Sequence, residues 1–267
     1  MELKLLKSTQ DILDLVSEMT TKPFEFIHNP DLNTLAAVKM ARQNMPSHYI
    51  YYKEKRAAVL DHLIAHECGH IYRMELVKIS DRKVPASNLQ NKHFALNQIE
   101  DDLEKMSQNF SVNQLSQLSN IWFDGIIRLV TNIPVDMRIE TWIFNEYPEL
   151  RKTQKKSIDL QMRDNIQVLS KRIESLTPDK IYYCNNVMNF AFAKFMESLI
   201  GKKYTTQYRH SKYADLGNKL ADLVITTEDM GYKQDIEIID KWTEMLDLQG
   251  WFYWTDFENL PADYLQN

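Results

Sequence analysis

The segment His66-Glu67-Cys68-Gly69-His70 combines two histidines and a glutamate at a spacing suited to metal chemistry. In an α-helix, residues four apart lie on one face about one turn apart, so His66 and His70 can direct imidazole nitrogens at one ion. Glu67 lies beside His66, where its carboxylate can reach a water molecule in an open coordination position. The pattern predicts that His66 and His70 bind Zn2+ and that Glu67 acts as the general base.

This arrangement would support hydrolysis. Zinc lowers the pKa of a bound water from nearly 16 to roughly 7. A neighbouring carboxylate can then accept a proton and deliver it to a leaving amine. Cys68 lies between the expected ligands and could act as an oxidisable or inhibitory thiol, but two residues after His66 it points to another face of the helix. We therefore expect Cys68 to belong to the core.

The third ligand has to come from another part of the chain, and two acidic segments are candidates. The segment 99–104 (IEDDLE) is also typical of a solvated acidic face, and His93 is a further, weaker candidate. Asp136 and Glu140 are four residues apart among apolar residues, where carboxylates are costly to bury unless they are paired or metal-bound. We predict Asp136 as the third ligand and Glu140 as either a ligand or the group that orients a ligating histidine. A structural ion pair with Arg138 or a neighbouring lysine is the alternative for both carboxylates.

The segment AHECGHIYRM, which follows the apolar segment HYIYYKE, resembles the zinc helix of the zincin superfamily of metallopeptidases. It is most similar to compact cytoplasmic members with a carboxylate third ligand, of the gluzincin or ImmA/IrrE-like kind. Asn132, Ile133, Asp136, Arg138 and Glu140 are also similar to a helix that follows the zinc motif in some bacterial metallopeptidases. The resemblance implies hydrolysis of a protein or peptide substrate, which the strand above the cleft would bind by strand addition.

A different class of function shares the same metal site. A regulatory or interaction protein could use the zincin scaffold to bind metal without hydrolysing a substrate. The intact Glu67 favours the peptidase. Peptide hydrolysis also needs a group that stabilises the oxyanion, and the aromatic candidates in the carboxyl half are not ranked by the sequence. These candidates are Tyr182, Tyr183, Tyr204, Tyr208 and His210.

The elements expected around the motif are two helices and two strands. Apolar spacing predicts a helix over 8–20 and a long helix over about 54–78 that carries the motif. Strands are expected at 24–28 and 48–54, and a loop at 78–93, near the cleft. Gly69 is a small residue at which another helix could approach the zinc helix closely.

The rest of the chain is predicted to be helical. Pro134, Pro148 and Pro178 are expected near helix starts, where a missing N–H is tolerated. The expected fold is mainly α (α+β), with a zincin-like core that contains a small β-sheet and the active-site helix, extended by a C-terminal helical layer. We expect the core at 1–150 and the extension at 151–267, or one continuous domain. The expected helices are 94–108, 112–130, 134–146, 150–175, 178–200, 207–228 and 234–248.

Composition narrows the class of protein. The 267 residues carry a net charge of −5 with both signs interspersed, so no polybasic surface favours nucleic acid or an anionic membrane as partner. There is no apolar run long enough for a membrane span and no secretion signal, and two cysteines cannot form a disulfide framework. We therefore expect a cytoplasmic protein. The sequence does not predict an oligomeric state.

Overall fold

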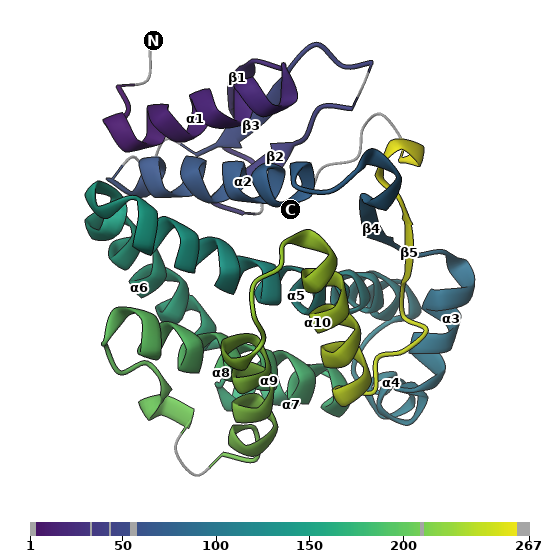
Figure 1. Ribbon diagram of the computed structural model, residues 1–267. Helices are drawn as coiled ribbons and strands as arrows, with labels where there is room; N and C mark the ends of the chain where they lie inside the picture. The colour runs from purple at the N-terminus through teal and green to yellow at the C-terminus, as the bar shows by residue number, and fades with distance from the viewer. Residues whose placement is uncertain (1–3, 33, 43, 54–57, 209–210, 261–267) are drawn as a thin grey trace.

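The computed structural model describes residues 4–32, 34–42, 44–53, 58–208 and 211–260. Across these residues the protein is mainly helical, with one three-stranded and one two-stranded sheet (Figure 1). The strands are β1 (Phe24–His28), β2 (Ala36–Lys39), β3 (His48–Tyr52), β4 (Lys83–Ala86) and β5 (Tyr253–Asp256). The helices are α1 (Lys7–Thr20), α2 (Leu60–Glu75), α3 (Leu89–Asn97), α4 (Glu100–Met106), α5 (Val112–Glu146), α6 (Arg151–Gln167), α7 (Lys171–Ser175), α8 (Asp179–Ile200), α9 (Ala214–Thr226) and α10 (Tyr232–Met245).

The N-terminal part is a layer made of α1, the three-stranded sheet and α2 (Figure 1). Its strand order is β1-β3-β2, with β1 parallel to β3 and β2 antiparallel to β3. The central strand is therefore β3, and β2 forms an edge of this sheet. The strand that the sequence predicts above the cleft is β3. Because β3 already pairs with a strand on each side, it cannot also bind a peptide by strand addition. The edge strand beside α2 is β2, which the sequence analysis did not predict.

Helix α2 is held at both ends by charged side chains. Near its start, the Asp61 carboxylate accepts hydrogen bonds from the backbone N–H of Leu6 at 2.7 Å and from the Thr9 hydroxyl at 2.8 Å. Near its end, Arg73 donates to Asp235 of α10 and to Asp229, with distances of 2.6 to 2.9 Å. These contacts fix the helix that carries the motif against α1 and α10.

Helix α5 is a single helix of 35 residues, although the sequence analysis predicted two helices with Pro134 near the start of the second. A capping box between Ser111 and Gln114 begins it. Pro134 lies in its interior and removes one backbone hydrogen bond. Apolar side chains on both sides of Pro134, including Ile133 and Val135, are buried, and this packing offsets the missing bond. The predicted start at Pro134 is therefore wrong.

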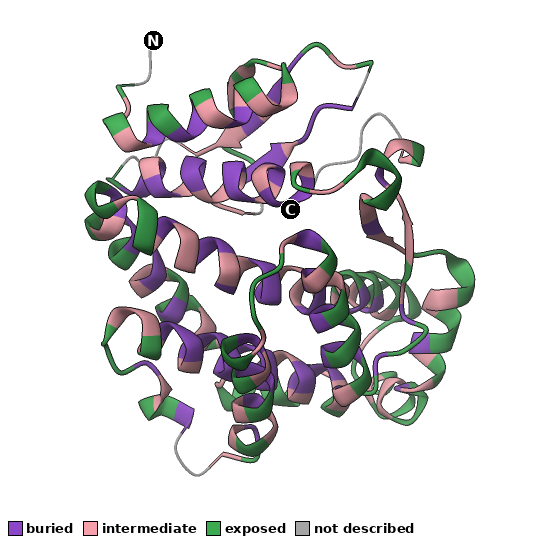
Figure 2. Ribbon diagram, viewed as in Figure 1, coloured by how far each residue is buried: buried purple, intermediate pink, exposed green. Residues whose placement is uncertain are grey.

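Buried apolar residues form two clusters. Figure 2 shows buried residues, in purple, both in the N-terminal layer and among the C-terminal helices. The first cluster joins α1, the three-stranded sheet and α2, and includes Ile139 and Ile143 from α5. The second is centred on α8, which packs against α5 and α9. Because α5 contributes to both clusters, it connects the N-terminal layer to the C-terminal helices. The predicted boundary near residue 150 stays a prediction.

Most of the other predicted elements are confirmed, with shifted ends. The expected loop at 78–93 is wrong, because it contains β4, which pairs with β5 near the end of the chain, and the start of α3. The start predicted for the motif helix, at 54–57, lies outside the described residues. None of the helices in the described ranges has the length and apolar character needed to cross a membrane.

Candidate metal centre

Two facing helices, α2 and α5, position the predicted site residues. Gly69 of α2 faces Ile139 of α5 so closely that a Cβ atom at Gly69 would lie 2.5 Å from Cγ2 of Ile139. The close approach expected at Gly69 is therefore confirmed, and the approaching helix is the one that carries Asp136 and Glu140. Histidines along one face of α2 thereby meet carboxylates spaced by four along α5.

The structure brings His66, His70 and Asp136 together. Oδ1 of Asp136 lies 3.4 Å from Nε2 of His66 and 3.4 Å from Nε2 of His70. This oxygen is buried and makes no hydrogen bond to any described residue. The three side chains are 12% to 17% exposed, so the group they form is reachable from solvent.

Glu140 lies behind this group, on the other side of the His66 ring. Its Oε1 is 2.9 Å from Nδ1 of His66, and its Oε2 is 2.9 Å from Nε2 of His62. Because a carboxylate only accepts hydrogen bonds, Nδ1 of His66 carries a proton, so Nε2 is the nitrogen that would present a lone pair to a metal ion. Nε2 is the atom that faces Asp136, so His66 is oriented as a metal ligand.

Among the described residues, two groups of three ligand atoms are close enough to hold an ion: His66 with His70 and Asp136, and His62 with His66 and Glu140. Zinc bonds of about 2.0–2.1 Å in a tetrahedron place neighbouring ligand atoms about 3.3 Å apart, which fits the first group. The 2.9 Å separations of the second group are hydrogen-bond distances. The donor set and spacing of His66, His70 and Asp136 therefore fit a zinc ion, and Glu140 fits the orienting role.

Charge interactions are consistent with these roles. Burial opposes ionisation of Asp136 and of Glu140, but the facing histidines outweigh burial and hold the pKa of each carboxyl below its usual value. Burial also opposes protonation of His66, yet the two carboxylates raise its pKa well above the usual value. The site is therefore a strongly cation-attracting group of two carboxylates around one imidazole.

Glu67 lies beside the three candidate ligands. Burial raises the pKa of its carboxyl, while His70 and His66 oppose that rise, and the Val38 backbone N–H of β2 donates a hydrogen bond to it. A carboxylate with a raised pKa is better suited to accept and return a proton near neutral pH. The interaction with Val38 also connects the expected base to the outer edge of β2.

A cavity of about 310 Å³ opens over these residues. One wall is formed by Glu67 and the three candidate ligands, together with Ala36 of β2. The opposite wall comes from α6 and α8 and includes the buried amide of Asn189. The cavity is large enough for a few side chains of a peptide. The strand at its border is β2, which is an edge strand of the three-stranded sheet.

Other sequence candidates lie elsewhere. His93 and the acidic segment 99–104 do not line the cavity and form no metal group with other described residues. Cys68 is fully buried in the first apolar cluster, as expected for a core residue, and burial raises the pKa of its thiol. Tyr182, Tyr183, Tyr204 and Tyr208 also do not line the cavity, and His210 lies outside the described residues.

Sequence reasoning missed two residues of this network, His62 and Gln154. His62 is four residues before His66, so the spacing that identified His66 and His70 also places it on the same helix face. Gln154 donates to Oε2 of Glu140 at 2.7 Å from α6, and nothing in its local sequence indicates this contact.

The chain was also compared with known proteins. No family model, curated protein or solved structure matches it. Its function therefore has to be argued from the site itself.

Proposed function

We propose that the protein is a zinc-dependent metallopeptidase of the zincin type. The observation that carries the proposal is the position of Asp136 Oδ1, which is buried without a hydrogen bond and 3.4 Å from Nε2 of both His66 and His70. A buried carboxylate oxygen without a hydrogen bond is costly, and a metal ion shared with the two histidines would compensate for that cost. Glu67 beside this group supports hydrolysis.

When bound, zinc would supply Lewis-acid activation of a water molecule and of the substrate carbonyl. The residues of the chain would do the rest. His66, His70 and Asp136 would hold the ion, and Glu140 would keep Nε2 of His66 directed at it. Glu67 would take the proton of the attacking water and deliver it to the leaving amine, because burial has raised its pKa toward the working range.

A peptide is the substrate best supported by the surroundings of the site. The edge strand β2 contributes Ala36 to the cavity wall, and an edge strand can bind an extended peptide through backbone hydrogen bonds. The side chains of such a peptide would enter the cavity of about 310 Å³ between α2, α5, α6 and α8. Polar side chains that line the cavity, including Asn132 of α5 and Asn189 of α8, would recognise those side chains.

The test is a comparison of the wild-type protein with Glu67→Gln. The variant should keep about one zinc per chain but lose peptide cleavage, because it removes the base and leaves the ligands intact. Cleavage would be scored by comparing new peptide termini in a whole-proteome digest. A zinc-loaded Glu67→Gln protein that still cleaves would refute the role of Glu67. Zinc binding without cleavage by the wild type would favour the non-proteolytic regulatory alternative.

A further inference from the structure

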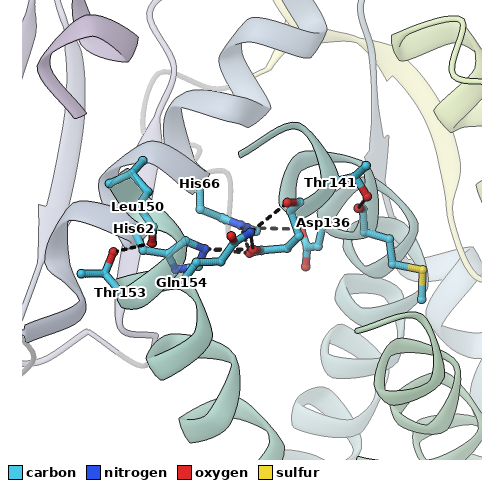
Figure 3. A network of polar contacts seen from close by, with 9 residues as sticks. His62, His66, Asp136, Thr141, Leu150, Thr153 and Gln154 are labelled. Carbon is cyan, nitrogen blue, oxygen red and sulfur yellow. Dashed lines mark hydrogen bonds and ion pairs between the residues drawn. The ribbon is translucent and has the colours of Figure 1, made fainter. Parts of the chain in front are cut away.

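The Glu140 carboxylate is held by three side chains from two helices. Nε2 of His62 donates to Oε2 at 2.9 Å and lies 3.1 Å from Oε1, and Nδ1 of His66 donates to Oε1 at 2.9 Å. Nε2 of Gln154 donates to Oε2 at 2.7 Å and to the backbone oxygen of Glu140 at 2.8 Å. Figure 3 shows His62, His66 and Gln154 pointing toward one another between α2, α5 and α6. Both carboxylate oxygens are therefore fixed.

The contacts of His62 and Gln154 with Glu140 are buried, although His62 and Glu140 themselves line the cavity. His62, Glu140 and Gln154 are each at most 4% exposed, whereas His66 and Asp136 are several times more exposed. Neither His62 nor Gln154 belongs to the group of His66, His70 and Asp136. The hydrogen bonds of both residues therefore reach the candidate metal group through Glu140, and the ring of His62 also lies 6.0 Å, centroid to centroid, from that of His66.

This arrangement is costly for the fold. Nδ1 of His62 and Oε1 of Gln154 are both buried and have no hydrogen-bond partner among the described residues. A buried polar atom without a partner costs about 1–3 kcal/mol. Apolar side chains in place of the whole group of His62, Glu140 and Gln154 would avoid this cost, so stability alone does not account for this buried polar network.

We infer that His62 and Gln154 are positioning residues of the metal centre, which clamp Glu140 so that Glu140 fixes the ring of His66. The inference rests on the proposed zinc site but not on peptide hydrolysis. A carboxylate that can rotate cannot hold the imidazole at one angle, and losing such an orienting partner typically weakens metal binding roughly 10- to 100-fold. Contacts that never touch the ion would then set how tightly His66 binds it.

The test uses the full chain and zinc alone. His62→Leu and Gln154→Met each remove one donor to Glu140 and keep most of the side-chain volume. Zinc dissociation constants would be measured by competition with a chromophoric chelator. We expect both variants to bind zinc roughly 10- to 100-fold more weakly than the wild type. Having two variants on two helices keeps the test usable if one of them does not fold.

Two further variants and a spectroscopic measurement separate a positioning role from a nonspecific disturbance of the fold. His62→Gln places an amide N–H near the position of Nε2, so it should restore most of the affinity lost in His62→Leu. The control His48→Asn changes another fully buried histidine that does not contact the site, and it should leave zinc affinity unchanged. The visible spectrum of bound Co2+ should change in His62→Leu and Gln154→Met but not in His48→Asn.

The outcomes distinguish the two proposals. The wild type could bind zinc tightly while His62→Leu and Gln154→Met show the same affinity and Co2+ spectrum. That result would overturn the positioning role of His62 and Gln154 but would not contradict the proposed function. A failure of His62→Gln to restore the affinity would also overturn it, because the donor at Nε2 would then not be what matters. Absence of zinc binding by the wild type would overturn the metal site itself, and the clamp with it.

Discussion

Gly69 of α2 packs against the side chain of Ile139 of α5, and a Cβ atom at Gly69 would lie only 2.5 Å from Cγ2 of Ile139. Three residues before Ile139 is Asp136, and one residue after it is Glu140. The separation of α2 and α5, and with it the distance from the histidines to the carboxylates, is therefore set at this contact.

Gly69→Ala should lower both stability and zinc affinity. In an exposed helix the change would favour folding by up to about 1 kcal/mol, but here the methyl group would meet Cγ2 of Ile139 at 2.5 Å. Overpacking of this kind costs about 1–3 kcal/mol. Pushing α5 away from α2 should also weaken zinc binding, measured by chelator competition.

Gly217→Ala is a matched control for this variant. Gly217 of α9 is equally close to another helix, because a Cβ atom there would lie 2.5 Å from Cδ1 of Phe190. It should lose stability in chemical denaturation while zinc affinity stays at the wild-type value. Equal zinc affinities in Gly69→Ala and Gly217→Ala would contradict the spacing role of Gly69.

Substitutions on α5 should separate a ligand from an orienting residue. Asp136→Ala should abolish stoichiometric zinc binding, because two histidines alone leave the tetrahedral set incomplete. Glu140→Gln should retain zinc but bind it roughly 10- to 100-fold more weakly. Both would be followed by metal analysis after dialysis and by chelator competition. The reverse ranking would make Glu140 the ligand.

The site was predictable from the sequence wherever helix periodicity determines it. His66, Glu67 and His70 belong to one local pattern, and Asp136 and Glu140 were identified by two carboxylates four residues apart in an apolar segment. The same periodicity would have identified His62, because it lies on the same face one turn earlier. Gln154 was not predictable, since its contact with Glu140 depends on how α6 returns against α2 and α5.

The fold can likewise be divided into elements that local sequence patterns predict and elements that depend on long-range contacts. Amphipathic helices and the strands β1 and β3 follow from local patterns. By contrast, β2 (Ala36–Lys39) is short and lacks the aromatic residues of β3, and it becomes a strand through pairing with β3. The proline in α5 indicated a helix start by local rules, and packing on both sides of Pro134 overrides that preference. Pairing across β4 and β5 joins residues about 170 apart, which no local pattern reveals.

His48 should make the protein less stable in mild acid. It is fully buried, its Nδ1 accepts a hydrogen bond from the Ala41 N–H, and burial, with a smaller effect of Lys22, lowers its pKa from 6.5 to about 4. Above pH 6.5 both the folded and unfolded states carry a neutral ring. Between pH 6.5 and 4 only the unfolded state takes up a proton, so the free energy of unfolding should fall by about 3 kcal/mol.

Urea denaturation as a function of pH would test this. In His48→Asn the amide oxygen can still accept from Ala41, and the side chain does not titrate. The difference between the wild-type and His48→Asn stability curves should therefore change between pH 6.5 and 4 and be flat above that range. A difference that stays constant down to pH 4 would rule out this role for His48.

Arg73 should show how burial controls the strength of its two ion pairs. Its guanidinium contacts Asp235, which is 1% exposed, and Asp229, whose side chain is 40% exposed. Asp235→Asn disturbs a buried pair and should cost about 3–5 kcal/mol of unfolding free energy. Asp229→Asn should cost about 1 kcal/mol or less, because solvent screens that pair. Equal losses in urea denaturation would contradict this ranking.

The central claim is that one zinc ion is held by His66, His70 and Asp136, with His62 and Glu140 behind them. The most direct measurement is a crystal structure of the full chain grown with zinc, with anomalous difference maps recorded on both sides of the zinc absorption edge. We expect one peak within about 2.0–2.2 Å of Nε2 of His66, Nε2 of His70 and Oδ1 of Asp136. A peak held instead by His62, Nδ1 of His66 and Glu140, or no peak between α2 and α5, would contradict it.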